Sequence, residues 1–381
     1  MSDRFTETTR TGFGSRIVSS FVGVLIGFLL IIVAIIVLWW NEGRAVQAAN
    51  ALAQGERSVV EASPDNVDPA ASGKLVHVTG QLSTTSPVRD QQFGVGGSDV
   101  VRLKRHVEMY QWKETKESHT TQNTGGSETT ETTYSYSKVW SDRPLDSSSY
   151  RHPDGHQNPD MPLTSRTFDS TGAHLGAYRV DQAVLAQMDA FSPYSVANAS
   201  PPSGFHAEGD TFYRGADSGS PKVGDMRVNF AAVTAQTMSV VAAVAGNTLT
   251  PFQAENGYEI KLAAPGVASA MTMLKNQEKS ERTLTWILRA GGFVGMLIGF
   301  MLIMGPLSTL ASVLPFLGGL VAAGAFAISL ALSIPIALVV IALAWFAHRP
   351  ILGIGLLIVA ALVFVGMIYR HRHRAHPTPA H

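Results

Sequence analysis

Cysteine is absent from this chain of 381 residues. Disulfide bonds, thiolate metal sites and a cysteine nucleophile are therefore excluded. Charge is also scarce, since charged residues make up 15% of the sequence, whereas ordinary soluble domains carry about 25%. The scarcity is concentrated in one place, because residues 290–347 contain no Lys, Arg, Asp, Glu or His. An uncharged run of this length is difficult to place in water, so the sequence indicates a membrane protein.

Long apolar runs predict four membrane-spanning helices. A spanning helix needs about 20 apolar residues at a rise of about 1.5 Å each. The first run ends in Trp39-Trp40, which suits an interfacial anchor, and it is longer than the apolar part of a signal peptide. We therefore expect it to be retained. The predicted spanning helices are residues 17–40, 284–304, 319–347 and 351–369. Gly and Pro residues interrupt the stretch 305–318, which stays open as a loop or an interfacial helix.

Between the first and second predicted helices lies a polar domain, residues 41–283. It carries 27 of the 29 acidic and 21 of the 29 basic residues, which gives a net charge of −6. The terminal segments, residues 1–16 and 370–381, are rich in Arg, and four helices place both on one side of the membrane. Because cytoplasmic segments beside membrane helices carry an excess of Lys and Arg, we expect both tails in the cytoplasm. The polar domain is then extracytoplasmic, facing the periplasm or a lumen.

The polar domain has the sequence pattern of a β-rich fold. In the stretch VRLKRHVEMYQWKETKESH (101–119), apolar residues alternate with charged and aromatic ones, which is the period of a strand. Residues 131–141 alternate too, and the polar segment between the two runs contains Gly125-Gly126. We therefore predict a long β-hairpin over residues 101–141. If the two glycines form a two-residue turn, position 111 pairs with position 140 and the aromatic row covers the apolar face. The predicted class is an α+β membrane protein.

Motifs that would indicate an enzyme, a metal site or nucleic-acid binding are missing. The sequence has no nucleophile elbow, no zinc-protease helix motif and no phosphate-binding glycine loop. His152 and His156 are four residues apart, but Pro153 and Gly155 between them break a helix and no third ligand is evident. The basic run 102–106 lies in an acidic domain, so we interpret it as the solvated face of a strand. We therefore expect no cofactor, no metal and no nucleic acid.

Three segments carry a resemblance to a known family: WWNEGRAV (39–46), VRLKRHVEMYQWKETKES (101–118) and VGDMRVNF (223–230). With shorter matches in the same order, the chain resembles the transmembrane protein 43 family, also called LUMA, over nearly its whole length. The resemblance implies one N-terminal span, a large lumenal domain and three C-terminal spans. It also implies membership of a group whose eukaryotic members reside in the endoplasmic reticulum and inner nuclear membrane, self-associate, and bind lamins and other envelope proteins.

The tail RHRHRAHPTPAH and the Ala- and Gly-rich helices are typical of a bacterial member. In a bacterium the family's nuclear-envelope role would have no counterpart, so membrane scaffolding and self-assembly would remain. The chain would then reside in the inner membrane with a periplasmic domain.

The leading hypothesis is a non-enzymatic multi-pass membrane protein that self-associates as a homo-oligomer and scaffolds membrane or envelope proteins in the lipid bilayer. One alternative is an extracytoplasmic ligand sensor that signals through its membrane helices and has a deep apolar pocket with few polar groups. Another is a membrane-bound hydrolase whose site assembles from distant residues. The residues that we expect to mediate interaction are Asn41, Glu42, Arg44, Arg105, His106, Glu108, Tyr110, Trp112, Tyr134, Tyr136 and Trp140.

Overall fold

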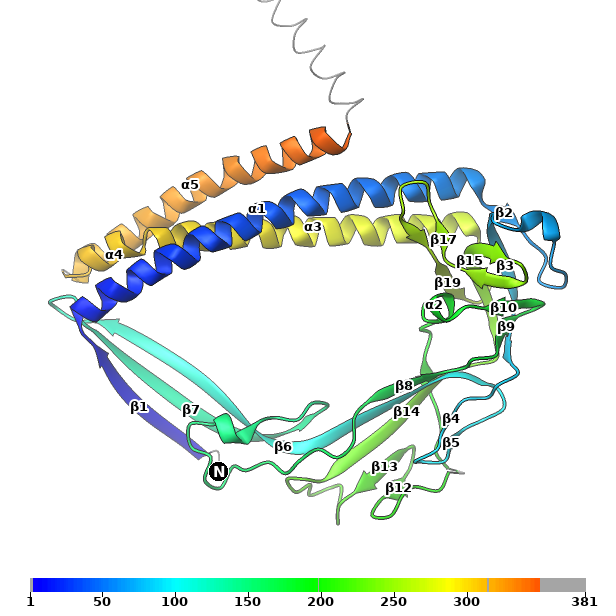
Figure 1. Ribbon diagram of the computed structural model, residues 1–381. Coiled ribbons are helices and arrows are strands. Elements are labelled where there is room, and N and C mark those ends of the chain that lie inside the picture. Colours follow the sequence, from blue (N-terminus) through cyan, green and yellow to red (C-terminus); the bar gives the residue numbers. More distant parts are fainter. Residues whose placement is uncertain (1–2, 198, 314, 350–381) are drawn as a thin grey trace, which may run out of the picture. The chain divides into compact units, whose positions relative to one another are not determined.

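The structure is a computed structural model that describes residues 3–197, 199–313 and 315–349 (Figure 1). The chain divides into two compact units, which we treat separately. The sheet unit comprises residues up to Thr11, Asn50–Thr121 and Glu128–Lys279. The helix unit comprises Gly12–Ala49, residues 122–127 and the described residues from Ser280 to Arg349. The expected helix at 351–369 and the basic tail at 370–381 lie outside the described residues.

The sheet unit contains two large sheets. The first has the order β1–β7–β6–β14–β13–β12, with β8 paired to β6 and β11 paired to β14. Its strands are β1 (Asp3–Thr11), β6 (Val100–Gln122), β7 (Glu128–Ser141), β8 (Arg166–Asp169), β11 (Ser192–Pro193), β12 (His206–Glu208), β13 (Thr211–Arg214) and β14 (Met226–Thr234). The prediction of a β-rich polar domain is confirmed, and the predicted long hairpin is β6 with β7.

The second sheet has the order β19–β15–β16–β10–β9–β3–β2. Its strands are β2 (Val60–Glu61), β3 (Leu75–Thr84), β9 (Ala173–Leu175), β10 (Tyr178–Val180), β15 (Thr237–Ala245), β16 (Thr248–Thr250) and β19 (Leu262–Pro265). Two small ribbons, β4 (Arg89–Asp90) with β5 (Val95–Gly96) and β17 (Phe252–Gln253) with β18 (Glu259–Ile260), and the helix α2 (Gln182–Leu185) complete the unit.

Alternation along β6 decides which face of the first sheet is buried. Leu103, Val107 and Met109 are at most 1% exposed and pack against Met226 and Val228 of β14 in one apolar core. Even-numbered residues from 104 onward point to the opposite face, as a period of two requires. The predicted strand and its apolar face are therefore confirmed.

The predicted register of the hairpin is wrong by one residue. The backbone N–H of Asn123 donates to the carbonyl of Ser127, so three residues, not two, form the turn. Farther along, Ser118 bonds to Thr132 and Thr120 to Thr130 through their hydroxyls. A slip of one residue moves side chains to the other face of a strand. Trp140 consequently lies beside Tyr110, away from the apolar core, and not over it.

The N-terminal segment forms a strand. Residues 3–11 were expected within a tail on the other side of the membrane from the hairpin, yet β1 pairs with β7 from Asp3↔Tyr136 to Thr11↔Glu128. Hydrogen-bonded strands occupy one compartment, because a bilayer cannot lie between backbone groups that bond directly. The pairing and the expected separation of residues 1–16 from the hairpin therefore exclude each other.

The helix unit contains most of α1 (Phe13–Ser58), the apolar part of α3 (Ala270–Ile303), the short α4 (Gly305–Ala311) and α5 (Pro315–His348). Among the described residues, three helices are long and apolar enough to cross a membrane: Phe13–Ser58, Ala270–Ile303 and Gly319–His348. These helices coincide in sequence with the first three predicted spans, and α1 and α3 extend well into the polar sequence. The stretch left open between the second and third spans begins as a helix, α4.

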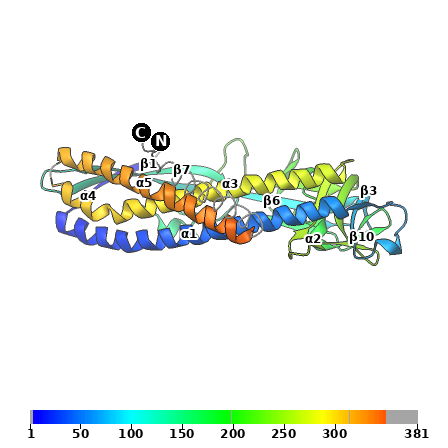
Figure 2. The same cartoon turned by 90° about the horizontal axis from the view of Figure 1, so that it is seen from above.

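Glycine lets α1 and α3 approach closely, and both views show these helices side by side (Figure 2). A Cβ at Gly299 would lie 2.7 Å from Ile31 Cγ1 and 2.8 Å from the Gly27 carbonyl oxygen. A Cβ at Gly292 would lie 2.7 Å from the side chain of Leu38. Small residues at both positions therefore allow the two helices to pack closely.

Candidate interaction face and helix seam

The face of the first sheet that points away from its core carries a charged and aromatic group. Glu108 on β6 lies opposite Arg227 on β14, and the Arg227 Nε donates to Glu108 Oε2 at 2.6 Å. The same guanidinium lies 4.6 Å from the ring centroid of Trp140, whose ring is 5.2 Å from that of Tyr110. All four side chains are partly exposed. This arrangement offers a flat contact area with a fixed cation and two large rings.

Tyr213 extends this face onto β13. It pairs with Arg227 across the sheet, and its ring lies 6.3 Å from that of Trp140. Its hydroxyl donates to Asp225 Oδ2 at 2.6 Å. Burial and this hydrogen bond raise the pKa of Tyr213 above the ordinary value, so the hydroxyl stays protonated and keeps its bond to the carboxylate. Arg227 and Tyr213 were not among the residues expected from sequence, although the alternation in MRVNF could have identified Arg227.

A second aromatic group holds β1 to the hairpin. Tyr136 is 1% exposed, stacks on His156 with a centroid distance of 3.9 Å, and donates to Glu114 Oε2 at 2.5 Å. Burial, followed by the bond to Glu114, raises the pKa of Tyr136 to about 12. His156 Nε2 in turn lies 3.1 Å from Asp3 Oδ2. The ring of Trp112 packs edge-on against His156. Tyr136 is thus buried within the protein, whereas Trp112 contacts His156 and stays partly exposed.

Tyr134 belongs to the same group but lies nearer the surface. Its ring faces His152 edge-on at 6.1 Å, and His152 stacks on Phe5 of β1 at 4.3 Å. Arg151 Nε donates to both carboxylate oxygens of Glu7, at 2.7 and 2.9 Å. This bond lowers the pKa of the Glu7 carboxyl. The segment that contains both histidines thus packs against β1. Among the described residues no group of three His, Asp or Glu side chains is arranged to hold a metal ion.

The basic run at the start of β6 is only partly solvated. Lys104 is exposed, as predicted, but Arg102 and Arg105 are each 7% exposed. Arg105 Nη1 donates to Asp90 Oδ2 at 2.8 Å, and Arg102 Nε donates to Asp169 Oδ1 at 2.7 Å. The interpretation of the run as a solvated face is therefore wrong for these two residues. A buried guanidinium needs a paired carboxylate, which only the tertiary fold supplies. Arg105 is therefore a buried ion-pair residue.

The seam between α1 and α3 takes up the three polar residues expected at the end of the first span. Glu42 is 1% exposed and accepts two bonds from Arg289, at 2.7 and 2.8 Å. Asn41 donates to the Thr285 carbonyl at 3.1 Å. Arg44 pairs with Glu281 and also donates to Thr285 Oγ1. These side chains join the two helices within one chain.

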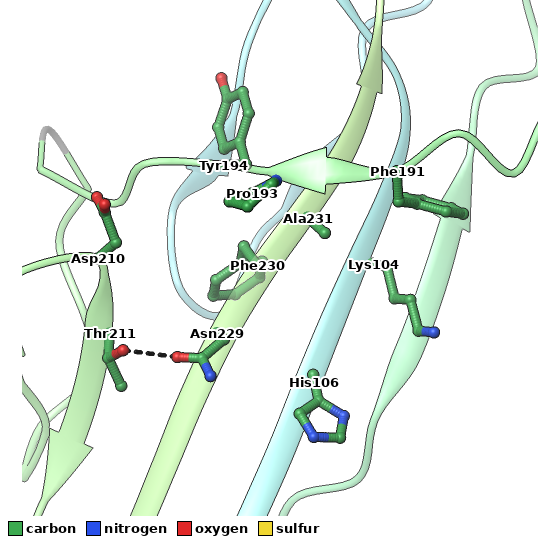
Figure 3. A pocket seen from close by; sticks show the side chains of 10 residues that line it. All are labelled: Lys104, His106, Phe191, Pro193, Tyr194, Asp210, Thr211, Asn229, Phe230 and Ala231. Carbon is green, nitrogen blue, oxygen red and sulfur yellow. Dashed lines mark hydrogen bonds between the residues drawn. The ribbon is translucent and has the colours of Figure 1, made fainter. Parts of the chain in front are cut away.

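A cavity of about 540 Å³ opens on the same outer face of the first sheet (Figure 3). Its floor includes Asn229 and Ala231 of β14, and its wall includes Phe191 and Tyr194 beside β11. Lys104 and the expected interaction residue His106 border it on the β6 side, and Asp210 borders it on the β13 side. Five of its ten lining residues are polar or charged, and the other five supply the apolar and aromatic surface that small-molecule sites use.

Comparison with known proteins decides the family. The family model for transmembrane protein 43 matches residues 109–350. The chain belongs to the transmembrane protein 43 family. It is 32% identical over 366 residues to transmembrane protein 43 of Rattus norvegicus, covering 91% of this chain and 90% of the rat protein. It is 30% identical over 379 residues to the Homo sapiens protein, covering 95% and 92% of the two chains.

A more distant member of the transmembrane protein 43 family is the Drosophila melanogaster homolog, which is 27% identical over 349 residues and is covered to 93% of its length. No solved structure matches this chain. The family named from three sequence segments is confirmed, and membership agrees with the apolar helices in making this an integral membrane protein.

Proposed function

We propose that this member of the transmembrane protein 43 family is a non-enzymatic membrane scaffold that self-associates through its sheet unit and gathers other membrane proteins around it. Its polar domain faces the extracytoplasmic side, which in a bacterium is the periplasm. Eukaryotic relatives would use the same assembly in the endoplasmic reticulum and the nuclear envelope.

Family membership carries this proposal, and the outer face of the first sheet supplies the contact surface. Tyr110, Trp140 and the Glu108–Arg227 pair present rigid rings and a fixed charge pair, which are the side chains that interfaces favour. The terminal strand β1 adds an open edge, because its only sheet neighbour within the described residues is β7. Both edges of β7 are already paired, with β1 and with β6. The long hairpin would therefore contact a partner through its outer face.

Cross-linking of the full chain in native membranes tests the proposal. A photo-reactive phenylalanine analogue at position 140 should capture a second copy, and the same analogue at the exposed position 255 on β17–β18's loop should not. The purified chain in lipid nanodiscs should have the mass of an oligomer, and Trp140→Ala with Arg227→Ala should shift it toward the monomer. A monomer in both membranes and nanodiscs would refute self-association.

A second candidate function is ligand sensing by the polar domain, and one observation favours it. The sensor hypothesis requires a deep apolar pocket with few polar groups, and the cavity at Lys104 and Phe191 supplies an apolar wall with five polar or charged residues beside it. A scaffold without a ligand does not require such a cavity. An experimental structure of the full chain with a ligand in this cavity would support sensing. A conformational change in the membrane helices on ligand binding would establish it.

A further inference from the structure

The cavity on the outer face of the first sheet has its charges at opposite sides. Strand pairing places Thr211, Asn229 and His106 in one row across β13, β14 and β6, and Pro193, Ala231 and Lys104 in the next. Because neighbouring strands lie about 4.8 Å apart, the β6 and β13 sides are separated by about 10 Å. Lys104 and His106 occupy the β6 side, and Asp210 borders the β13 side.

The Lys104 ammonium has no partner of its own in the described part of the chain. No hydrogen bond, ion pair or ring contact involves it in residues 3–197, 199–313 and 315–349, whereas Arg102 and Arg105 on the same strand are each bound to a carboxylate. The nearby imidazole of His106 lies 3.8 Å from Glu108 on the side away from Lys104. Lys104 is thus an exposed cation at the border of a partly apolar cavity, and no side chain among the described residues pairs with it.

The body of the cavity suits hydrocarbon. Phe191 stands beside Lys104, held by the guanidinium of Arg102 at 5.2 Å from its ring, and Tyr194 and Pro193 continue the wall. The backbone N–H of Tyr194 donates to the Phe230 carbonyl, which fixes this wall to β14. At the far side, Thr211 Oγ1 donates to Asn229 Oδ1 at 2.6 Å, which ties these two polar lining groups to each other.

We infer that this cavity binds a small monocarboxylate with an apolar body. The carboxylate lies against Lys104, the body packs on Phe191 and Tyr194, and Asp210 repels a second anionic group at the other end. A volume of about 540 Å³ accommodates a small molecule but is too small for a folded protein. This inference rests on the second candidate function, ligand binding by the polar domain, and adds the chemical class of the ligand.

The test uses 4-phenylbutyrate as the probe and 4-phenylbutanol as its neutral analogue. Binding is measured by saturation-transfer difference NMR on the full chain in lipid nanodiscs, with empty nanodiscs subtracted. We expect Lys104→Ala to weaken binding of the acid by about tenfold or more and to leave the alcohol unchanged. Ala231→Ile, which fills the floor without removing a polar group, should abolish binding of both. Lys113→Ala, an exposed lysine on the same strand, is the matched control and should change neither.

The outcomes separate the class of ligand from the existence of the site. Equal affinity for the acid and the alcohol, both lost in Ala231→Ile, would overturn the anion assignment and leave ligand binding intact. Stronger binding of phenyl phosphate than of 4-phenylbutyrate would replace the carboxylate by a phosphate such as a lipid headgroup carries. Absence of binding of every probe, or binding that Ala231→Ile leaves unchanged, would overturn both the inference and the sensing function.

Discussion

Glu42 of α1 and Arg289 of α3 form a two-point ion pair, with Arg289 Nε 2.7 Å from Glu42 Oε1 and Nη2 2.8 Å from Oε2. The carboxylate is 1% exposed, so it depends on this partner for nearly all of its solvation. The two residues lie 247 positions apart in sequence. Their ion pair joins α1 to α3 in addition to the close contacts at the glycines.

Removing either partner of this pair should destabilise the helix unit. Breaking a buried ion pair leaves an unpaired charge, which typically costs about 3–5 kcal/mol. Because Arg289 is partly exposed, we expect Glu42→Ala to lower the free energy of unfolding by less than that. Adding Arg289→Met removes the unpaired charge, so the double variant should recover part of the lost stability. Thermal unfolding of the purified chain in detergent measures this. Arg57→Gln, at an exposed position near the end of α1, is the control. Additive losses in the double variant would contradict the coupling.

Glycine at 299 is required for the approach of α1 and α3. An added Cβ would meet Ile31 at 2.7 Å, so Gly299→Ala should destabilise the helix unit by about 1–3 kcal/mol. Gly291→Ala is the matched control, since nothing lies within 4 Å of its Cβ and alanine is the better helix former. In detergent, Gly299→Ala should unfold at a lower temperature than the unsubstituted chain, and Gly291→Ala at the same temperature or a higher one. The reverse order would mean that the helices do not pack here.

Ionisation of Tyr136 should loosen the contact between β1 and the hairpin at high pH. Its folded pKa of about 12 lies above the ordinary value of 10.0. A raised pKa means that the stabilisation is complete below pH about 10 and is lost as the pH rises toward 12. Tyr136→Phe should therefore flatten the fall in stability across this window, as followed by unfolding and by tyrosinate absorbance. Glu114→Gln removes the second cause of the shift and should lower the pKa of Tyr136 only in part, since burial is the larger cause. An unchanged pH profile in Tyr136→Phe would count against the burial of this ring.

The pairing of β1 with β7 can be tested directly because the chain has no cysteine. Thr8 lies opposite Glu131 and Thr9 opposite Thr130. The two test variants are Thr8→Cys with Glu131→Cys and Thr9→Cys with Thr130→Cys. Because successive antiparallel pairs alternate between a wider and a closer Cα spacing, one of the two variants should form a disulfide on mild oxidation. Thr8→Cys with Lys138→Cys, which are not paired, should not. The measurement is peptide mass spectrometry after oxidation in native membranes.

A companion measurement decides the side of the membrane. Single cysteines at Thr8 and at Ser118 should react with a membrane-impermeant maleimide from the same side in sealed vesicles. Reaction from opposite sides, with no disulfide in either paired variant, would restore the cytoplasmic N-terminal tail predicted from the charge distribution and remove β1 from the sheet.

Features that depend on local pattern could be read from the sequence. Uncharged runs of about 20 residues identify helices that need lipid, and the alternation of Val101, Leu103, Val107 and Met109 identifies a strand and its buried face. Each of these follows from chemistry repeated at short range along one element.

Features that depend on a partner far away in the chain were decided by the tertiary structure. One more residue in the turn at 124–126 moved Trp140 to the outer face, because strand pairing has a period of two. Arg105 is buried because Asp90 meets it, and residues 3–11 form a strand because β7 offers an edge. The cavity at Lys104 is assembled from β6, β14 and the residues around β11 and β13, which are brought together only by the order of strands in the sheet.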